Sequence, residues 1–237
     1  MNSIFITGTD TDAGKTVVSA AIIKAVASQG VRAVGLKPIA SGFEMIDGQL
    51  RNADVDALTG ASNVSLPERI INRYAFKPAI APHIAAAQEG EVLDFDAIQQ
   101  GVAFAKERAD FVLVEGVGGW HVPLSAPDLD SNDLPVKDIE SLAQHLELPV
   151  VLVVGLRLGC INHAVLTARA IINSGLPLLG WVANHVDPHF DRVAENITTL
   201  EALLPASKLF ELPYLESNES LEVEKMAQLP FIQFLSK

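Results

Sequence analysis

The sequence predicts a doubly wound α/β domain in which a mostly parallel central sheet carries helices on both faces. Short apolar runs that do not alternate with polar residues are typical of strands buried on both faces, as in a parallel sheet. Amphipathic stretches separate these runs, which implies right-handed βαβ units. The chain has 237 residues, 49% hydrophobic and 19% charged, which suits one large domain with its own core.

The predicted strands are rich in Val, Leu and Ile, and they are Ile4–Thr7, Arg32–Lys37, Phe111–Val114, Val150–Val154 and Leu178–Ala183. A helix follows the first strand, and later helices carry apolar residues at three- and four-residue spacing; they are Lys15–Ser28, Phe95–Lys106, Lys137–His145, Ile161–Asn173 and Arg192–Leu204. Gly42–Leu50 and Ser125–Leu134 are predicted loops. We expect a single domain over residues 1–237, with residues 126–138 as a surface insertion.

Composition narrows the class of protein. A formal net charge of −12 disfavours binding to nucleic acid or to anionic membranes. Cys160 is the only cysteine, so no intrachain disulfide is possible and a reducing cytoplasm is the expected compartment. No secretory signal is visible, and the longest apolar run, near Leu148–Leu156, is too short to span a bilayer. We expect a soluble, cytoplasmic protein.

A glycine-rich loop, Gly8–Thr16, lies between the first strand and the first helix, which is the context of a P-loop. Backbone N–H groups and the helix N-terminus can enclose phosphate oxygens there. Lys15 would contact the β- and γ-phosphates of ATP, and the Thr16 hydroxyl would bind Mg²⁺. Five residues separate the two glycines where four are common, which indicates a subclass. The alternative, a Gly-Lys-Thr that only caps a helix, does not explain the flanking strand and helix.

Three further charged residues follow or flank strands. Pro38 cannot continue a central ladder, so Lys37 is expected at the carboxyl edge of the sheet, near the phosphates. A second lysine there would stabilise charge that develops on a transferring phosphoryl group. Glu115 follows the strand Phe111–Val114 and is a candidate metal ligand. Asp54 is a second candidate, although spacing alone fits a helix N-cap equally well.

Short motifs in a characteristic order cover nearly the whole chain, and with them the chain resembles the dethiobiotin synthetase family. Each motif alone is a weak signal, whereas their order and spacing together are strong. They are Thr7-Gly8-Thr9-Asp10-Thr11 with Gly14-Lys15-Thr16, Lys37-Pro38 with Ser41-Gly42, Arg51-Asn52 with Asp54, Pro82-His83-Ile84, Gln88-Glu89-Gly90, Val114-Glu115-Gly116 with Gly118-Gly119-Trp120, Leu158-Gly159-Cys160-Ile161-Asn162-His163, and Gly180-Trp181-Val182-Ala183-Asn184.

The resemblance implies a P-loop NTPase-like fold and a reaction in which 7,8-diaminononanoate (diaminopelargonic acid), CO₂ and ATP give dethiobiotin, ADP and phosphate. It implies Lys15 and Lys37 as catalytic residues. Nucleotide contacts are implied for Asp12, Ala13, Gly14, Lys15, Thr16, Val17, Asp54, Glu115, Gly116, Val117, Gly118, Asn184, His185, Pro213, Tyr214 and Leu215. Mg²⁺ ligands are implied for Thr16, Asp54 and Glu115, and substrate contacts for Thr11, Ser41, Gly159, Cys160, Ile161 and Asn162.

The resemblance also implies a homodimer, because in the family the segment Gly159–Asn162 comes from the neighbouring subunit. Free N–H groups at this strand-to-helix turn could bind the distal carboxylate of the substrate. The side chains of Cys160 and Ile161 are expected to pack in the core, so that the backbone would do the binding. His83 and His163 have no spacing that suggests a metal site.

The sequence departs from the family at three places. Asp12 stands where many members have Glu, and its shorter side chain would alter the contact made there. His185 follows Asn184 where Asp is frequent, which bears on base selectivity. The acidic stretch Ala126–Asp138 is longer than in the family, and we expect it to be an exposed loop.

Two other classes of protein remain as alternatives. An amidoligase of the cobyrinate type shares the loop but typically carries a glutaminase domain with a catalytic cysteine, for which this chain is short. A ParA/MinD-like switch ATPase would carry an additional lysine at position 10 or 11, where this chain has Asp10 and Thr11. Such a switch also needs a basic surface or a C-terminal amphipathic membrane helix, whereas Glu216–Glu224 is acidic.

Overall fold

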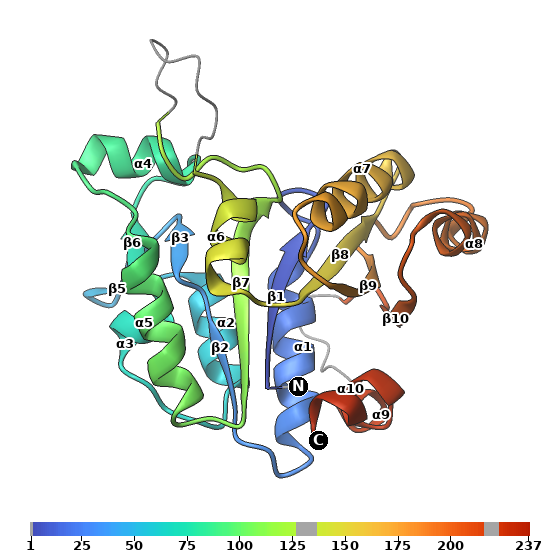
Figure 1. Cartoon of the computed structure of the whole chain (residues 1–237), viewed down its shortest axis with the longest axis horizontal. Coiled ribbons are helices and arrows are strands. Elements are labelled where there is room, and N and C mark those ends of the chain that lie inside the picture. The colour runs from blue at the N-terminus through green and yellow to red at the C-terminus, as the bar shows by residue number, and fades with distance from the viewer. Residues whose placement is uncertain (1, 127–136, 216–222) are drawn as a thin grey trace.

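A six-stranded parallel sheet forms the centre of the protein in a computed structural model, which describes residues 2–126, 137–215 and 223–237 (Figure 1). The strand order is β10-β9-β8-β1-β7-β2, so the chain proceeds in opposite directions on the two sides of β1. In doubly wound sheets ligands bind beside this reversal, at the carboxyl ends of the strands. The strands are β1 (Ser3–Gly8), β2 (Ala33–Leu36), β7 (Phe111–Gly119), β8 (Val150–Leu156), β9 (Leu178–His185) and β10 (Lys208–Leu212).

Helices cover both faces of this sheet. Figure 1 shows these helices around the sheet. Side chains of α5, α6, α7 and α8 contribute to the core on one face, and those of α1, α2, α9 and α10 contribute to the core on the other. Phe5 belongs to the first core and its neighbours Ile4 and Ile6 to the second, because successive side chains of a strand point to opposite faces. The helices are α1 (Lys15–Ala27), α2 (Ala53–Ala61), α3 (Glu68–Ile71), α4 (Pro82–Glu89), α5 (Phe95–Lys106), α6 (Ile139–Leu146), α7 (Cys160–Asn173), α8 (Val193–Leu203), α9 (Val223–Ala227) and α10 (Pro230–Leu235).

The predicted fold class is confirmed, and every strand and helix predicted from periodicity overlaps with an observed one. The predicted strand at Phe111–Val114 continues to Gly119. Sequence periodicity missed the edge strand β10, in which Lys208 and Glu211 interrupt the apolar pattern. Charged residues are typical of edge strands, where they discourage pairing with other chains.

The chain leaves the central sheet at Pro38, as predicted. The next strand, β3 (Ile39–Ser41), pairs with β6 (Tyr74–Phe76) in a separate two-stranded sheet. The Pro38 carbonyl accepts hydrogen bonds from the backbone N–H groups of Arg73 and Tyr74. Lys37 therefore stands at the junction of the two sheets, with its backbone fixed on both sides.

The prediction of a loop at Gly42–Leu50 is wrong. This segment contributes to an antiparallel hairpin of β4 (Glu44–Ile46) and β5 (Gln49–Arg51). Asp47 and Gly48 connect the strands with positive φ angles of 51° and 77°. An Asp-Gly pair favours such a two-residue turn, because both residue types tolerate positive φ.

The second predicted loop, Ser125–Leu134, falls largely on residues 127–136, which lie outside the described part of the chain. Backbone hydrogen bonds from the N–H groups of Leu124 and Ser125 to the Lys137 carbonyl, at 2.6 and 3.2 Å, tie the flanking segments together.

Two glycine substitutions test the packing of β2 against α1 and α2. A Cβ on Gly35 would lie 2.5 Å from Ile23 Cδ1 and 3.2 Å from Leu58 Cβ. We expect Gly35→Ala to lower the free energy of unfolding by about 1–3 kcal/mol in urea titrations. In the matched control Gly60→Ala, where the added Cβ meets nothing within 4 Å, we expect a gain of about 0.5–1 kcal/mol from helix propensity. Unchanged stability of Gly35→Ala would contradict the close packing.

Candidate active site

The segment Gly8–Thr16 connects β1 to α1 as the predicted phosphate loop. Gly14 is the N-cap of α1 with φ 80°, and Asp12 has φ 61°, a conformation that Asp tolerates better than most residues. A Cβ on Gly14 would lie 2.0 Å from the side-chain nitrogen of Asn184, so both space and backbone conformation require glycine there. The Asn184 amide donates to the Ala13 carbonyl at 2.9 Å, which fixes the loop against β9.

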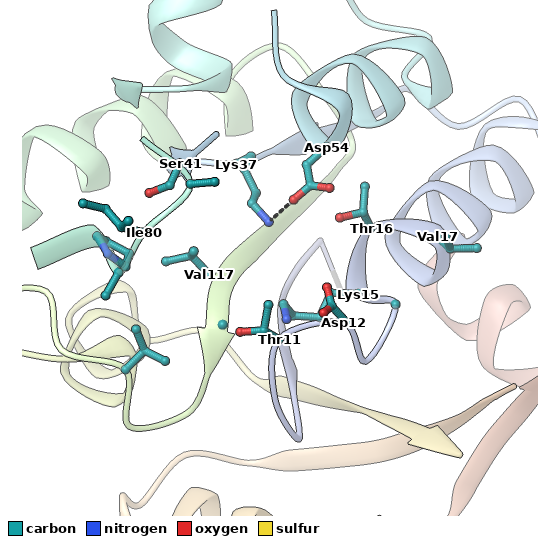
Figure 2. A pocket seen from close by; sticks show the side chains of 16 residues that line it. Thr11, Asp12, Lys15, Thr16, Val17, Lys37, Ser41, Asp54, Ile80 and Val117 are labelled. Carbon is teal, nitrogen blue, oxygen red and sulfur yellow. Dashed lines mark ion pairs between the residues drawn. The ribbon is translucent and has the colours of Figure 1, made fainter. Parts of the chain in front are cut away.

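Lys37, Asp54 and Glu115 meet beside this loop, although they come from the end of β2, from α2 and from β7. The Lys37 ammonium lies 2.6 Å from Glu115 Oε1. It also lies 2.9 Å from Asp54 Oδ2, in the ion pair that Figure 2 marks with a dashed line. The Thr16 hydroxyl donates to the same Glu115 oxygen at 2.8 Å. Lys37 and Glu115 are 2% and 1% exposed, so these charges are compensated by each other and not by water. Parallel-strand topology has brought together residues 78 positions apart.

The two lysines differ in their electrostatic environment. Burial lowers the pKa of Lys15 to about 8, and the nearby Lys37 ammonium adds to this shift. Burial also acts to lower the pKa of Lys37, but Glu115 and Asp54 outweigh it and raise that pKa. Lys15 Nζ lies 3.0 Å from the Asp10 carbonyl, and no carboxylate of the described residues lies within ion-pair distance of it. Lys15 is therefore the lysine that a phosphate would stabilise most.

Asp54 is not the N-cap of α2. The side-chain oxygen of Asn52 accepts hydrogen bonds from the backbone N–H groups of Asp54 and Val55, at 3.1 and 3.2 Å, and so caps the helix. The Asp54 carboxylate turns towards Lys37 instead (Figure 2). Burial alone would raise its pKa, yet the Lys37 charge and hydrogen bond hold the pKa of Asp54 below its usual value.

A cavity of about 600 Å³ lies next to Lys37 and Asp54. Figure 2 shows the side chains that line it. Eleven lining residues had been predicted as site residues: Thr11, Asp12, Gly14, Lys15, Thr16, Val17, Lys37, Ser41, Asp54, Val117 and Gly118. No sequence pattern predicted the apolar wall, which consists of Ala79, Ile80, Ala81, Pro82 and Val122. Pro82 does belong to a motif noted in the sequence, so that motif was the available signal.

Two polar atoms at this site lack hydrogen-bond partners among the described residues. They are Ser41 Oγ, on the wall of the cavity, and Glu115 Oε2, behind Lys37 and Thr16. Buried polar atoms are usually satisfied in folded proteins, so each of these indicates a place for a ligand atom, an ion or water.

The remaining predicted site residues lie outside the lining of this cavity. Ala13 is buried within the loop, where Asn184 makes its contact, and Glu115 and Gly116 are buried residues of β7. His185 pairs with Glu211 at 2.7 Å, and Tyr214, within the segment 213–215, is 42% exposed. Gly159, with φ 96°, starts α7, and the Cys160 side chain is buried while Asn162 is exposed. The roles predicted for these residues stay predictions.

Within residues 2–126, 137–215 and 223–237, no group of three or more His, Cys, Asp and Glu side chains could hold a metal ion by itself. In the same ranges, no helix has the length and apolar character needed to cross a membrane.

Residues 2–221 match the family described as AAA domain. ATP-dependent dethiobiotin synthetase BioD of Photobacterium profundum is 44% identical over 95% of this chain and 98% of its own length. The enzyme of the same name from Pseudomonas paraeruginosa is 47% identical over 91% of both chains, and BioD 1 of Salmonella typhi is 45% identical over 89% of both. The chain belongs to the dethiobiotin synthetase family.

Two solved structures share the fold of this dethiobiotin synthetase family member. A ParA family ATPase from Chlorobium tepidum TLS has a TM-score of 0.52 and 10% identity, over 91% of this chain and 85% of that one. The MinC:MinD cell division protein complex of Aquifex aeolicus has a TM-score of 0.53 and 13% identity, over 100% of this chain and 91% of that one. At such identities the likeness concerns the fold alone.

The lowered pKa of Lys15 predicts proton uptake on nucleotide binding. Phosphate oxygens favour the charged lysine, so above pH 8 the free protein must regain the proton when ADP binds. Calorimetry in EDTA, with buffers of different ionisation enthalpy, should show little uptake by this group at pH 7 and roughly one proton at pH 9. ADP affinity should fall above pH 8 by at most about tenfold per pH unit.

Lys15→Arg serves as the control, because arginine stays charged over this pH range. We expect this variant to bind ADP more weakly than the wild type. Its binding of ADP should not be accompanied by proton uptake at this position. Equal uptake at pH 7 and pH 9 in the wild type would contradict a contact between Lys15 and phosphate.

Proposed function

We propose that this protein catalyses the ring-closing carboxylation of 7,8-diaminononanoate with CO₂ and ATP, which gives dethiobiotin, ADP and phosphate in biotin biosynthesis. The observation that carries the proposal is the convergence of Lys15 and Lys37 on one cavity at the carboxyl edge of the sheet. The 43–47% identity to enzymes named for this product supports it. The single thiol, Cys160, is buried and free, which suits a reducing cytoplasm.

The proposed reaction needs positioning more than proton transfer. One amine of the substrate adds CO₂ and loses a proton to give a carbamate, whose oxygen is already anionic and needs no general base. This oxygen attacks the γ-phosphorus and ADP leaves. The second amine then attacks the carbamoyl carbon, phosphate leaves, and the ring closes with loss of a proton. Lys15 would hold the β- and γ-phosphates and Lys37 the carbamate and phosphate oxygens, so that both neutralise developing charge.

Oxygen donors of the site fit Mg²⁺. The Thr16 hydroxyl and the carboxylates of Asp54 and Glu115 are hard ligands of the kind that Mg²⁺ prefers. Glu115 Oε2, which is buried without a partner among the described residues, supports this fit. When bound, the ion would neutralise charge on the β- and γ-phosphates. We assign these three residues to hold it.

Lys37 occupies the space between the two carboxylates that we assign to the metal. Its ammonium therefore competes with a divalent cation as long as no nucleotide is bound. We expect Lys37→Met to bind Mn²⁺, a paramagnetic substitute for Mg²⁺, at least ~10-fold more tightly than the wild type without nucleotide, because the internal counter-charge is gone. Electron paramagnetic resonance of free Mn²⁺ measures this affinity. Lys37→Arg keeps a cation and should stay weak, and equal affinities of wild type and Lys37→Met would contradict the competition.

Turnover tests the proposed reaction itself. We expect phosphate release from ATP only when the diamine, bicarbonate and Mg²⁺ are all present, together with a product of the mass of dethiobiotin. Lys37→Ala should lower kcat by at least ~10²-fold, because a transition-state charge contact is lost. Rapid ATP hydrolysis without the diamine would instead favour a switch ATPase.

We also propose that the protein is a homodimer in which the α7 N-terminus of one subunit binds the distal carboxylate of the substrate in the other. Gly159 leaves the first N–H groups of this helix without a side-chain cap. Leu158, just before α7, and Leu166, within α7, are 93% and 58% exposed. A second subunit could cover these two side chains. We assign Asn184, His185 and the segment 213–215 to the adenine. Sedimentation equilibrium tests the dimer, which a monomeric mass would exclude.

A further inference from the structure

Asp10 places a negative charge within the loop that is expected to bind phosphate. Its side chain is 28% exposed, so the carboxylate is only partly screened by water. Like charges repel, and an acidic side chain at this place opposes the binding of a polyphosphate. The same residue is also useful to the site, since its backbone carbonyl lies 3.0 Å from the Lys15 ammonium. The loop therefore benefits from a group that neutralises the Asp10 carboxylate and keeps its backbone in place.

Arg157 supplies such a group. It directly follows β8, and β8 pairs with β1 in parallel, so their carboxyl ends lie at the same edge of the sheet. Arg157 Nη2 donates to Asp10 Oδ2 in an ion pair and lies 3.4 Å from the Thr11 carbonyl oxygen. His163, in the first turn of α7, adds a ring nitrogen 3.9 Å from the same carboxylate oxygen. Two basic side chains from the β8–α7 segment thus converge on one acidic residue of the loop.

We propose that Arg157 is a positioning residue for the phosphate loop, which acts by neutralising Asp10 and bracing the Asp10–Thr11 backbone. Arg157 lies outside the lining of the cavity, so it acts through the loop and not on the substrate. With this brace the Asp10 carbonyl stays on Lys15, and the phosphates meet a loop without net repulsion. The inference rests on the proposed function in one respect, namely that the loop binds a nucleotide.

Binding of ADP, measured by calorimetry at pH 7, tests this role. Arg157→Gln should weaken binding roughly fivefold or more, because the Asp10 charge is then uncompensated. The defect should shrink as salt rises from 0.05 to about 0.5 M, since salt screens this repulsion. A side chain that only packed against the loop would show no such salt dependence. Arg157→Lys keeps the charge and should recover most of the affinity.

A double-mutant cycle separates neutralisation of Asp10 from other effects. In the Asp10→Asn background, Arg157→Gln should cost less than twofold, because no carboxylate remains to be neutralised. Arg32→Gln is the matched control: Arg32 forms an ion pair with Asp110 through two contacts of 2.9 and 2.6 Å, far from the loop. It removes the same charge from the protein and should leave ADP affinity unchanged.

Wild-type affinity in Arg157→Gln would overturn the proposal, and so would a defect that persists undiminished in the Asp10→Asn background. If Arg157→Gln does not fold, Arg157→Lys and the double variant still test the proposal, because neither leaves the Asp10 carboxylate uncompensated. Both should bind ADP nearly as well as the wild type, and a loss of fivefold or more in either would contradict the proposal. Failure of the wild type to bind ADP at all would instead contradict the proposed function and leave the Asp10–Arg157 contact unexplained.

Discussion

The structure of the site depends on how buried charged side chains compensate one another. Lys37 is buried between Asp54 and Glu115, and Lys15 is buried beside it without a carboxylate of its own among the described residues. An uncompensated buried charge costs several kcal/mol, so such a group is retained where a ligand of opposite charge completes it. On a chain with net charge −12, Lys15 is thus the buried cation of this cluster that is left for an anionic ligand.

The parallel sheet makes this cluster possible. Glu115 lies in β7, between β1 and β2, so the residues that follow those two strands, in the phosphate loop and at Lys37, flank it. Pro38 then removes the chain from the sheet and frees space for the cavity. The helix that carries Asp54 is capped by Asn52, so the Asp54 carboxylate remains available for Lys37. Apart from Glu115, which lies within β7, the residues of the cluster thus stand at or near the ends of regular elements.

This chain shares its fold with ParA and MinD structures, but its sequence is similar to that of dethiobiotin synthetases. The ParA family and MinC:MinD structures share the fold, yet at 10–13% identity this likeness says nothing about the chemistry of this chain. The loop itself is more informative, because Asp10 and Thr11 occupy the two positions at which we expect the additional lysine of a ParA/MinD-like switch ATPase. In this chain the positive charge next to position 10 comes instead from Arg157, at the end of a neighbouring strand.

The sequence alone predicted five of the six strands of the central sheet, five of the helices that cover it and most of the cavity lining, because buried parallel strands and a glycine-rich loop leave local patterns. It did not reveal the hairpin at β4 and β5, although Asp47 and Gly48 carried a turn signal, and it left the role of Asp54 open. Tertiary structure alone decided that Asn52 caps α2, that Arg157 meets Asp10, and that the wall from Ala79 to Pro82 closes the cavity. The last two contacts join residues far apart in the chain, and they depend on which strand ends share an edge, which no local pattern records. The Asn52 cap is local, but Asn and Asp can both cap a helix, so only the structure showed which residue does so.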